Sequence, residues 1–363
     1  MNILTLRIKG MFHRPRTGGG FGSAVLGACL LLAAFGPGRP APVFSAGAPE
    51  IELKLATLAP ENSSLTRIFE EMNLEIIRET GGKVGFKLFA GAVMGDEEDV
   101  LRKLRANVIH GAAFTSPALT DINPDLRAFL IPFMFNDNRE VDHVLANMDQ
   151  SLKRKFEEKG YVVMGWPELG FLYFMSSSPV AGLEDLKGKR VWAKANAPMS
   201  QALIERVGVS TVAIGVPDVL MGLQTRLVDV VYNSPYYALA TQWNTQVKYL
   251  TDLPLTYIGG ALLLDRKAFG RIPAPLQGKF REICGKHVGR LVERTRKDNA
   301  EAMELIFKRG VTRVTPSMAQ VQAFKDLSDT AMKDLDPTLL PPEATQTVRR
   351  LLAEHRSSVK NQP

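Results

Sequence analysis

From about residue 51 onward, segments with the two-residue hydrophobic repeat of a strand alternate with segments that carry the longer repeat of an amphipathic helix. Residues 51–60, IELKLATLAP, predict a strand that runs into a loop, and residues 65–82 predict a helix that ends at a glycine pair. A strand, a helix and another strand follow over 83–91, 96–109 and 110–116. This alternation is typical of an α/β fold with a mostly parallel sheet, whose ligand sites lie at the carboxyl ends of strands.

A second run of the same kind begins near residue 161. Residues 188–195 predict a short strand, residues 216–229 a helix, and residues 230–239, VVYNSPYYAL, a strand that leaves through a loop. Beyond a strand over 257–265 the repeat becomes helical from 275 to about 309, with inward positions predicted at Phe280, Ile283, His287, Leu291, Met303 and Ile306. A helix of this length is expected to cross between two domains.

The first 46 residues have a different pattern. Basic residues up to Arg16 precede the apolar run SAVLGACLLLAAF over 23–35, which has about the length of a signal-peptide core and is short for a bilayer span. We expect a signal peptide, 1–46, that is cleaved near 45–48 and exports the protein to the periplasm. An uncleaved anchor and a lipoprotein signal at Cys29 are the alternatives, and no later window approaches 18 consecutive apolar residues.

The net charge of the chain is much smaller once this segment is excluded. The formal net charge of +7 includes five basic residues before Pro49, where there is no acid, so removing the segment takes five from seven and leaves +2. A charge of this size gives no support to a nucleic-acid partner.

Residue types that carry catalysis are present without the arrangements that catalysis needs. The five histidines are scattered, and the chain has no nucleophile elbow, phosphate loop or dinucleotide fingerprint. GDEED, over 95–99, is explained by an acidic helix start more simply than by a metal cluster. Cys284 is the one cysteine outside the signal segment, so no disulfide is expected. We therefore expect no catalytic residue, no cofactor and no metal, and a protein that is not an enzyme.

Several stretches, taken in order, resemble the solute-binding receptor of tripartite ATP-independent periplasmic (TRAP) transporters, the DctP-like family. The resemblance covers about residues 51–315, and it rests on the order and spacing of its motifs. These are LKLATLAPENSSL (53–65), TGGKV (80–84), VMGDEEDVLRKLRANVIHGA (93–112), PDLRAFLIPFMF (124–135), EDLKGKRV (184–191) and GLQTRLVDVVYNSP (222–235).

The resemblance implies a two-domain α/β clamp, periplasmic-binding-protein-like, with the long helix crossing the domains. Such a clamp closes on a small molecule and presents it to the TRAP membrane permease subunits. The domains expected are 49–170 plus 258–298 (domain I) and 171–257 plus 299–345 (domain II), followed by a C-terminal tail, 346–363. We expect a monomer that binds no nucleic acid. In one branch of the family, receptors work with a helical-repeat periplasmic helper protein. Such a helper protein is kept as an alternative partner of this chain.

The chain departs from the family at the positions that fix a carboxylate. Family members typically use an arginine in the strand after LKG, and that position falls on Trp192; a second arginine of some acid-binding members falls on Leu172. Arg190 shares the strand face of Trp192, so Arg190 or Arg226 remains an alternative anion ligand. Asn233 matches the family's asparagine.

Trp192 thus has two interpretations, a core tryptophan or a flat pocket wall with one N–H donor, and its motif position favours the pocket. The residues expected to line the ligand site are Trp192, Asn233, Tyr232, Tyr236, Glu168 as an acceptor, Thr57, Thr115, Ser116, Leu172 and Arg190.

The leading hypothesis is a periplasmic receptor whose ligand is less acidic, or more apolar or aromatic, than a C4-dicarboxylate. The alternatives are an organic-acid receptor that uses Arg190 or Arg226 with Asn233, an exported α/β enzyme, and a receptor that acts through a helper protein.

Overall fold

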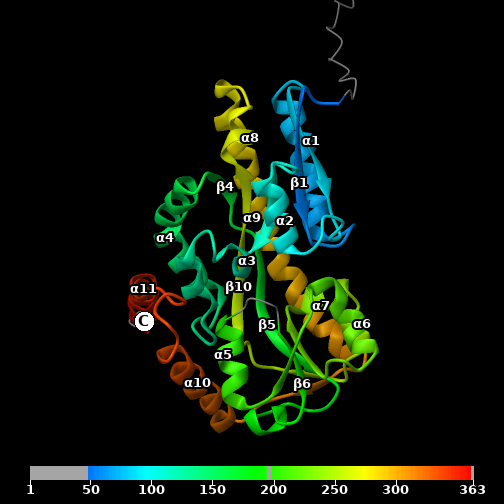
Figure 1. The fold of residues 1–363 in the computed structure, drawn as a ribbon, viewed down its shortest axis with the longest axis vertical. Helices are drawn as coiled ribbons and strands as arrows, with labels where there is room; N and C mark the ends of the chain where they lie inside the picture. Colours follow the sequence, from blue (N-terminus) through cyan, green and yellow to red (C-terminus); the bar gives the residue numbers. More distant parts are fainter. Residues whose placement is uncertain (1–47, 194–197, 361–363) are drawn as a thin grey trace, which may run out of the picture. The chain divides into compact units, whose positions relative to one another are not determined.

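The strands of the two runs join one mixed sheet. The computed structural model describes residues 48–193 and 198–360, so the expected signal peptide, 1–46, lies outside the described residues. Within them, 11 strands form a sheet whose main path is β2-β1-β3-β10-β5-β8-β6-β7 (Figure 1). Helices lie on both sides of it, as an α/β fold requires.

The first lobe, as we name it, comprises one end of this sheet and its helices. Its strands are β1 (Ile51–Thr57), β2 (Val84–Phe89), β3 (Gly111–Thr115), β4 (Tyr161–Gly165) and the second half of β10 (Thr256–Asp265). Its helices are α1 (Ser64–Glu79), α2 (Glu97–Arg105), α3 (Ser116–Leu119), the 3-10 helix η1 (Pro124–Leu130), α4 (Asn138–Glu158) and α8 (Arg266–Gly270).

The second lobe comprises the other end of the sheet. Its strands are β5 (Glu168–Ser176), β6 (Arg190–Ala193), β7 (Ser210–Ala213), β8 (Val230–Asn233), β9 (Tyr249–Thr251) and β11 (Thr312–Val314). Its helices are η2 (Leu183–Leu186), α5 (Pro198–Val207), η3 (Val216–Asp218), α6 (Val219–Gln224), α7 (Pro235–Ala240), η4 (Trp243–Thr245) and α10 (Met318–Lys333).

The strand directions differ from those of the mostly parallel sheet that the sequence predicts. β1 pairs in parallel with β2 and β3, and β6 with β7 and β8, but β10 is antiparallel to β3, β4 and β5. β10 pairs with β5 through its first residues and with β3 and β4 through its last, with a register shift between Ile258 and Gly259. One long strand therefore joins both lobes, and its return direction makes the centre of the sheet antiparallel.

Each lobe has an apolar core on both faces of its part of the sheet. Alternate residues of β1 separate between the faces, with Leu53 and Leu55 on one side and Ala56 on the other. In the second lobe, Trp192 of β6 lies in one core and its neighbour Val191 in the other. The two-residue repeat thus supplies two buried faces, as expected of strands covered by helices on both sides.

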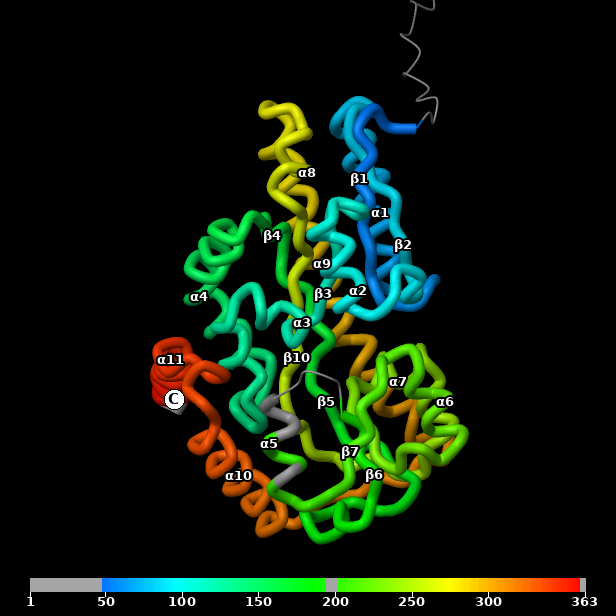
Figure 2. Tube along the Cα trace, in the orientation of Figure 1, coloured from blue at the N-terminus to red at the C-terminus, as the bar shows by residue number. Residues whose placement is uncertain are grey.

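The long helical repeat forms α9 (Ala274–Lys308), 35 residues that contact α1 and β4 in the first lobe and β5 and α7 in the second (Figure 2). Five of the six predicted inward positions are buried, and Met303 is partly buried. Within the described residues, none of the helices is long and apolar enough to span a membrane.

Two segments differ from expectation. Residues 346–360 of the segment expected as a tail, 346–363, belong to α11 (Pro342–Lys360), which packs against α4 and buries Val348, Leu351 and Leu352. Their three- and four-residue spacing gives the helix an apolar face that needs cover. The strand expected over 230–239 ends at Asn233, because Ser234 caps α7 by accepting a hydrogen bond from the Tyr237 N–H.

Candidate solute-binding site

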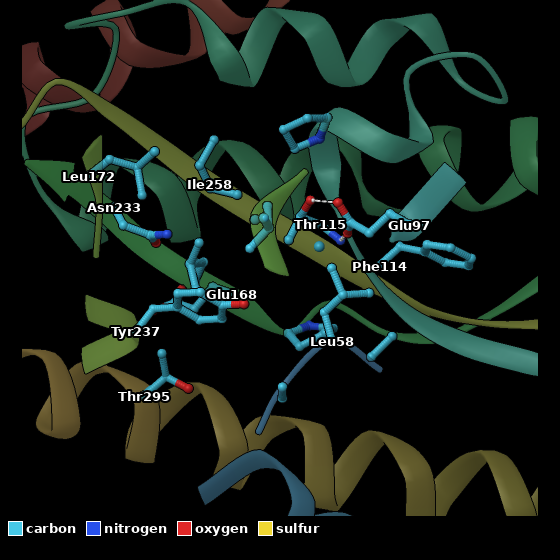
Figure 3. Close-up of a pocket in the computed structure, with 18 of the residues that line it drawn as sticks. Leu58, Glu97, Phe114, Thr115, Glu168, Leu172, Asn233, Tyr237, Ile258 and Thr295 are labelled. Atoms are coloured by element: carbon cyan, nitrogen blue, oxygen red, sulfur yellow. Dashed lines mark hydrogen bonds between the residues drawn. The ribbon is translucent and has the colours of Figure 1, made fainter. Parts of the chain in front are cut away.

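A cavity of about 220 Å³ lies where the ends of several strands from both lobes meet. The first lobe contributes the carboxyl ends of β1 and β3, Thr57 and Thr115, and the second lobe contributes Asn233 at the carboxyl end of β8. Thr295 of α9 forms part of the wall (Figure 3). A cavity of roughly 150 Å³ admits benzene in a well-studied protein, so this one has room for a small organic molecule.

Most residues expected at the site do line this cavity. They are Thr57, Thr115, Glu168, Leu172, Trp192, Tyr232, Asn233 and Tyr236. Ser116 and Arg190 are not among its lining residues. Ser116 is buried, and its hydroxyl has no hydrogen-bond partner in the described part of the chain. These eight residues come from β1, β3, β5, β6, β8 and α7, so long-range contacts bring them together.

Trp192 combines the two expected roles. It is only 4% exposed, lies beside Tyr232 with ring centres 5.0 Å apart and ring planes tilted by 38°, and meets Trp243 edge-on at 5.6 Å. Its indole N–H donates to the carbonyl of Ile214 at 3.0 Å. The expectation that this N–H is offered to a ligand is therefore wrong, and Trp192 presents an apolar ring surface to the cavity.

Asn233 and Tyr236 supply polar groups. The Asn233 side-chain oxygen accepts a hydrogen bond from the Ser234 N–H at 2.8 Å, and the side chain is directed toward the centre of the site (Figure 3). The Tyr236 hydroxyl oxygen accepts from the Ser64 N–H at 3.0 Å, which connects α7 of the second lobe with the start of α1. In the described part of the chain the Tyr236 hydroxyl acts only as an acceptor, so its proton can be donated to a ligand.

Glu97 is a wall residue, whereas its sequence context, GDEED, predicts only an acidic helix start. It is 3% exposed at the first turn of α2, and its carboxylate accepts from the Thr115 N–H at 2.6 Å and from the Thr115 hydroxyl at 2.9 Å (Figure 3). Burial, together with the negative charges of Glu97 and Asp96, raises the pKa of Tyr237. Local sequence gave no signal for this role, because Glu97 shares its first-turn position with two other acids.

Glu168 lies in the wall. The sequence predicts that its carboxylate accepts a hydrogen bond from the ligand, but the carboxylate already accepts hydrogen bonds from the protein. Arg296 of α9 donates to it at 2.9 and 3.0 Å, and the Tyr257 hydroxyl donates at 2.8 Å. Arg296 also makes a two-point ion pair with Asp142 of α4. Burial, followed by the charge of Glu168, raises the pKa of Tyr257. This network joins β5, β10, α4 and α9 beside the cavity.

Arg190 and Arg226, the two arginines predicted as alternative anion ligands, are not among the described lining residues of the cavity. The Arg190 guanidinium makes two hydrogen bonds of 2.8 Å to Asp229, whose pKa is lowered chiefly by this contact. Arg226 is exposed and takes a left-handed backbone conformation, with φ at 57°, which a glycine would adopt more readily.

A different arginine lies at the cavity. Arg127 of η1 is the one lysine or arginine among the described lining residues, and its side chain is 13% exposed. Its guanidinium donates to the Thr338 carbonyl at 3.2 Å and comes within 3.5 Å of Asp121, whose side chain is 75% exposed. An exposed carboxylate at this distance is largely hydrated, so Arg127 retains much of its capacity to bind an anion.

The fold and the site define a class. Two lobes joined by a crossing strand and a long helix, with a small-molecule cavity built from both, are the organisation of a solute-binding protein. The model of the DctP family, bacterial extracellular solute-binding protein family 7, matches residues 55–336, and the chain belongs to this family. The protein is thus an extracytoplasmic receptor of a TRAP-type transporter, which binds a small molecule and is not an enzyme.

Individual relatives are distant. A solute-binding protein of Verminephrobacter eiseniae is 26% identical over 259 residues, which cover 70% of this chain and 76% of the relative. The sugar acid binding protein of Advenella mimigardefordensis, solved with galactonate, superposes with a TM-score of 0.79 at 16% identity, covering 85% of this chain and 99% of that one. A TRAP periplasmic solute-binding protein of Desulfovibrio salexigens, solved with orotic acid, gives a TM-score of 0.77 at 18% identity, covering 85% and 99%. These two structures confirm the two-lobed α/β fold.

Proposed function

We propose that this receptor captures a small organic solute with a flat or apolar body and at most one carboxylate, and delivers it to its TRAP permease. The observation that carries the proposal is the composition of the cavity wall at two positions. Leu172 and Trp192, which stand where the family resemblance puts carboxylate-binding arginines, both line the cavity. The ring of Trp192 and the side chain of Leu172 favour an apolar surface over an ionic one.

Charge in the wall argues against a dicarboxylate. Glu97 and Glu168 lie in the wall, and Arg127 is the one cationic side chain among its described residues. Within the described wall, a second carboxylate on the ligand would find no second cationic partner, and its desolvation would be unfavourable. One carboxylate can be held by Arg127, while Asn233 and Tyr236 offer neutral hydrogen bonds.

The ligands of the structural neighbours fit the acid part of this proposal. Orotic acid, in the Desulfovibrio salexigens protein, combines a planar ring with one carboxylate. The alternative that uses Arg190 gains no support, because its guanidinium is already paired with Asp229.

The proposal also includes export by the segment 1–46, the two-domain division, and action as a monomer. A helper protein between receptor and permease remains the second route of delivery. Native mass spectrometry of protein recovered from the periplasm would report the N-terminal cleavage, the oligomeric state and any co-purified solute or partner together. Cleavage away from residues 45–48, or an oligomer, would count against this part.

Replacing Arg127 tests the ligand class. Benzoate, which has a flat ring and one carboxylate, is expected to bind more tightly than succinate in calorimetric titration. Arg127→Met is expected to weaken benzoate binding roughly 10- to 100-fold, because a hydrogen bond to a charged group is worth about 1.5–3 kcal/mol. The matched control, Arg190→Met, removes a cation that lies outside the cavity and should leave benzoate affinity within about twofold. Tight succinate binding that Arg127→Met leaves intact would refute the proposal.

A further inference from the structure

A second, smaller cavity of about 90 Å³ lies in the second lobe, between the sheet and the helices α5 and α10. Its lining residues are almost all apolar, and none of those described is charged; they include Phe133, Phe174, Val191, Ile204, Val207 and Phe324. The hydroxyl of Thr256, a polar group in this wall, donates to the Leu130 carbonyl at 3.1 Å. The wall thus offers little to water, and such cavities stay dry and accept apolar molecules.

The second cavity is adjacent to the first. Tyr232 and Thr256 line both cavities, so these two side chains form the partition between them. The Tyr232 ring lies between Trp192, 5.0 Å away on the first side, and Phe174, 6.4 Å away on the second. A partition made of side chains can be moved by rotation about side-chain bonds without any rearrangement of the sheet.

The wall of the second cavity is also held in an uncommon backbone conformation. Phe133 has φ at 59°, a left-handed value that is a strained state for a bulky residue, and its N–H donates to the Leu255 carbonyl at 2.8 Å. The Phe133 ring lies 6.3 Å from that of Phe324 across this wall. An apolar cavity costs stability, since the side chains around it have fewer packing partners in the protein. Backbone strain and a cavity at one place are features of ligand sites more than of a core selected for stability.

We infer that the second cavity is an apolar subsite, which receives the hydrocarbon arm of a ligand whose polar end lies in the first cavity, with Tyr232 turning aside to admit it. The ligand class is then an aryl- or alkyl-substituted monocarboxylic acid. This inference rests on the proposed function for the placement of the polar end, and it adds the direction and chemistry of the other end.

A series of acids with arms of increasing length tests the inference. Benzoate, 3-phenylpropanoate and 5-phenylpentanoate would be titrated against wild type and against Val207→Phe, which places a larger side chain in the second cavity. Wild type is expected to gain about fourfold in affinity per added methylene until the subsite is filled, from the transfer free energy of one methylene group. Val207→Phe should abolish this gain while benzoate affinity stays within about twofold. The matched control, Val93→Phe, makes the same change at a site that is 65% exposed and should keep the gain. No gain with arm length in wild type, or the same gain in Val207→Phe, would overturn the inference.

Xenon supplies a readout that does not depend on the acid. Crystals of wild type under xenon pressure should hold xenon in the second cavity, and crystals of Val207→Phe should not. If benzoate does not bind but wild type takes up xenon in the second cavity, the proposal that the ligand is a carboxylic acid is refuted, whereas the apolar subsite is supported. A second cavity in wild type that excludes xenon would overturn the subsite, whatever benzoate does.

Discussion

Trp192 shows how one side chain serves both the core and the binding site. Its N–H is committed to the Ile214 carbonyl, its edge meets Trp243, and its ring still borders the cavity beside Tyr232. The residue that breaks the family's arginine pattern is therefore a structural anchor as well as a ligand wall. Its hydrogen bond should affect stability, and its ring should affect binding.

Trp192→Phe separates these two contributions. We expect the free energy of unfolding to fall by about 1–3 kcal/mol, because the variant leaves the Ile214 carbonyl without its donor. Benzoate affinity should change less than about threefold, since an aromatic ring remains. Urea denaturation and calorimetry measure the two quantities.

Trp166→Phe is the matched control for this experiment. The Trp166 N–H donates to Asp149, whose side chain is 36% exposed and can be rehydrated, so the loss of stability should be under about 1 kcal/mol. A Trp192→Phe variant as stable as wild type would contradict the assignment of a buried structural hydrogen bond.

At the scale of elements, α9 supports the site through Arg296. The side chain of Glu168 is 1% exposed, and its negative charge is compensated by Arg296, which also reaches Asp142 on α4. A helix that contacts both lobes thus holds a charged wall residue in place, because a buried carboxylate is stable only with its partner present.

Arg296→Met should lower the free energy of unfolding by about 3–5 kcal/mol, since it leaves a buried carboxylate without its cation. The matched control is Arg290→Met on the same helix. Arg290 pairs with Glu71, and both side chains are about half exposed, so this change should cost less than about 1 kcal/mol. Equal effects of the two variants in urea denaturation would argue against a structural role for the Glu168–Arg296 pair.

At the scale of the whole molecule, two hydrogen bonds run between the lobes at the cavity. The Ser64 N–H donates to Tyr236, and the Val216 N–H donates to Asp96 at 3.4 Å. We propose that the lobes separate when these bonds open, about the part of β10 where its pairing changes from β5 to β3 and β4. A ligand that touches both lobes shifts the population toward the closed form by its difference in affinity for the two forms.

Tyr236→Phe should weaken this closure. It leaves the Ser64 N–H without an acceptor in the closed form only, so benzoate affinity should fall about three- to tenfold. Small-angle scattering should show wild type becoming more compact on saturation, and the variant should need more ligand for the same change. Tyr249→Phe, in β9 and outside the cavity lining, is the control and should behave as wild type. An unchanged scattering profile for saturated wild type would disprove the closure.

Local pattern was sufficient for most of the elements. The strands β1 to β3 and the helices α1, α2 and α9 follow the predicted order, because their apolar positions recur with the period of the element that buries them. The family was also accessible from the chain alone, since its motifs retain their order and spacing over residues 55–336.

Contacts between distant residues decided the rest. The direction of β10, the packing of α11 on α4, the pairing of Arg190 with Asp229, and the positions of Glu97 and Arg127 at the cavity all depend on partners far away in the chain. A two-residue or helical repeat states which face of an element is buried, but it does not state what covers that face or which charge lies opposite. The elements of this receptor therefore follow from local sequence, whereas the chemistry of its cavity arises only when the two lobes meet.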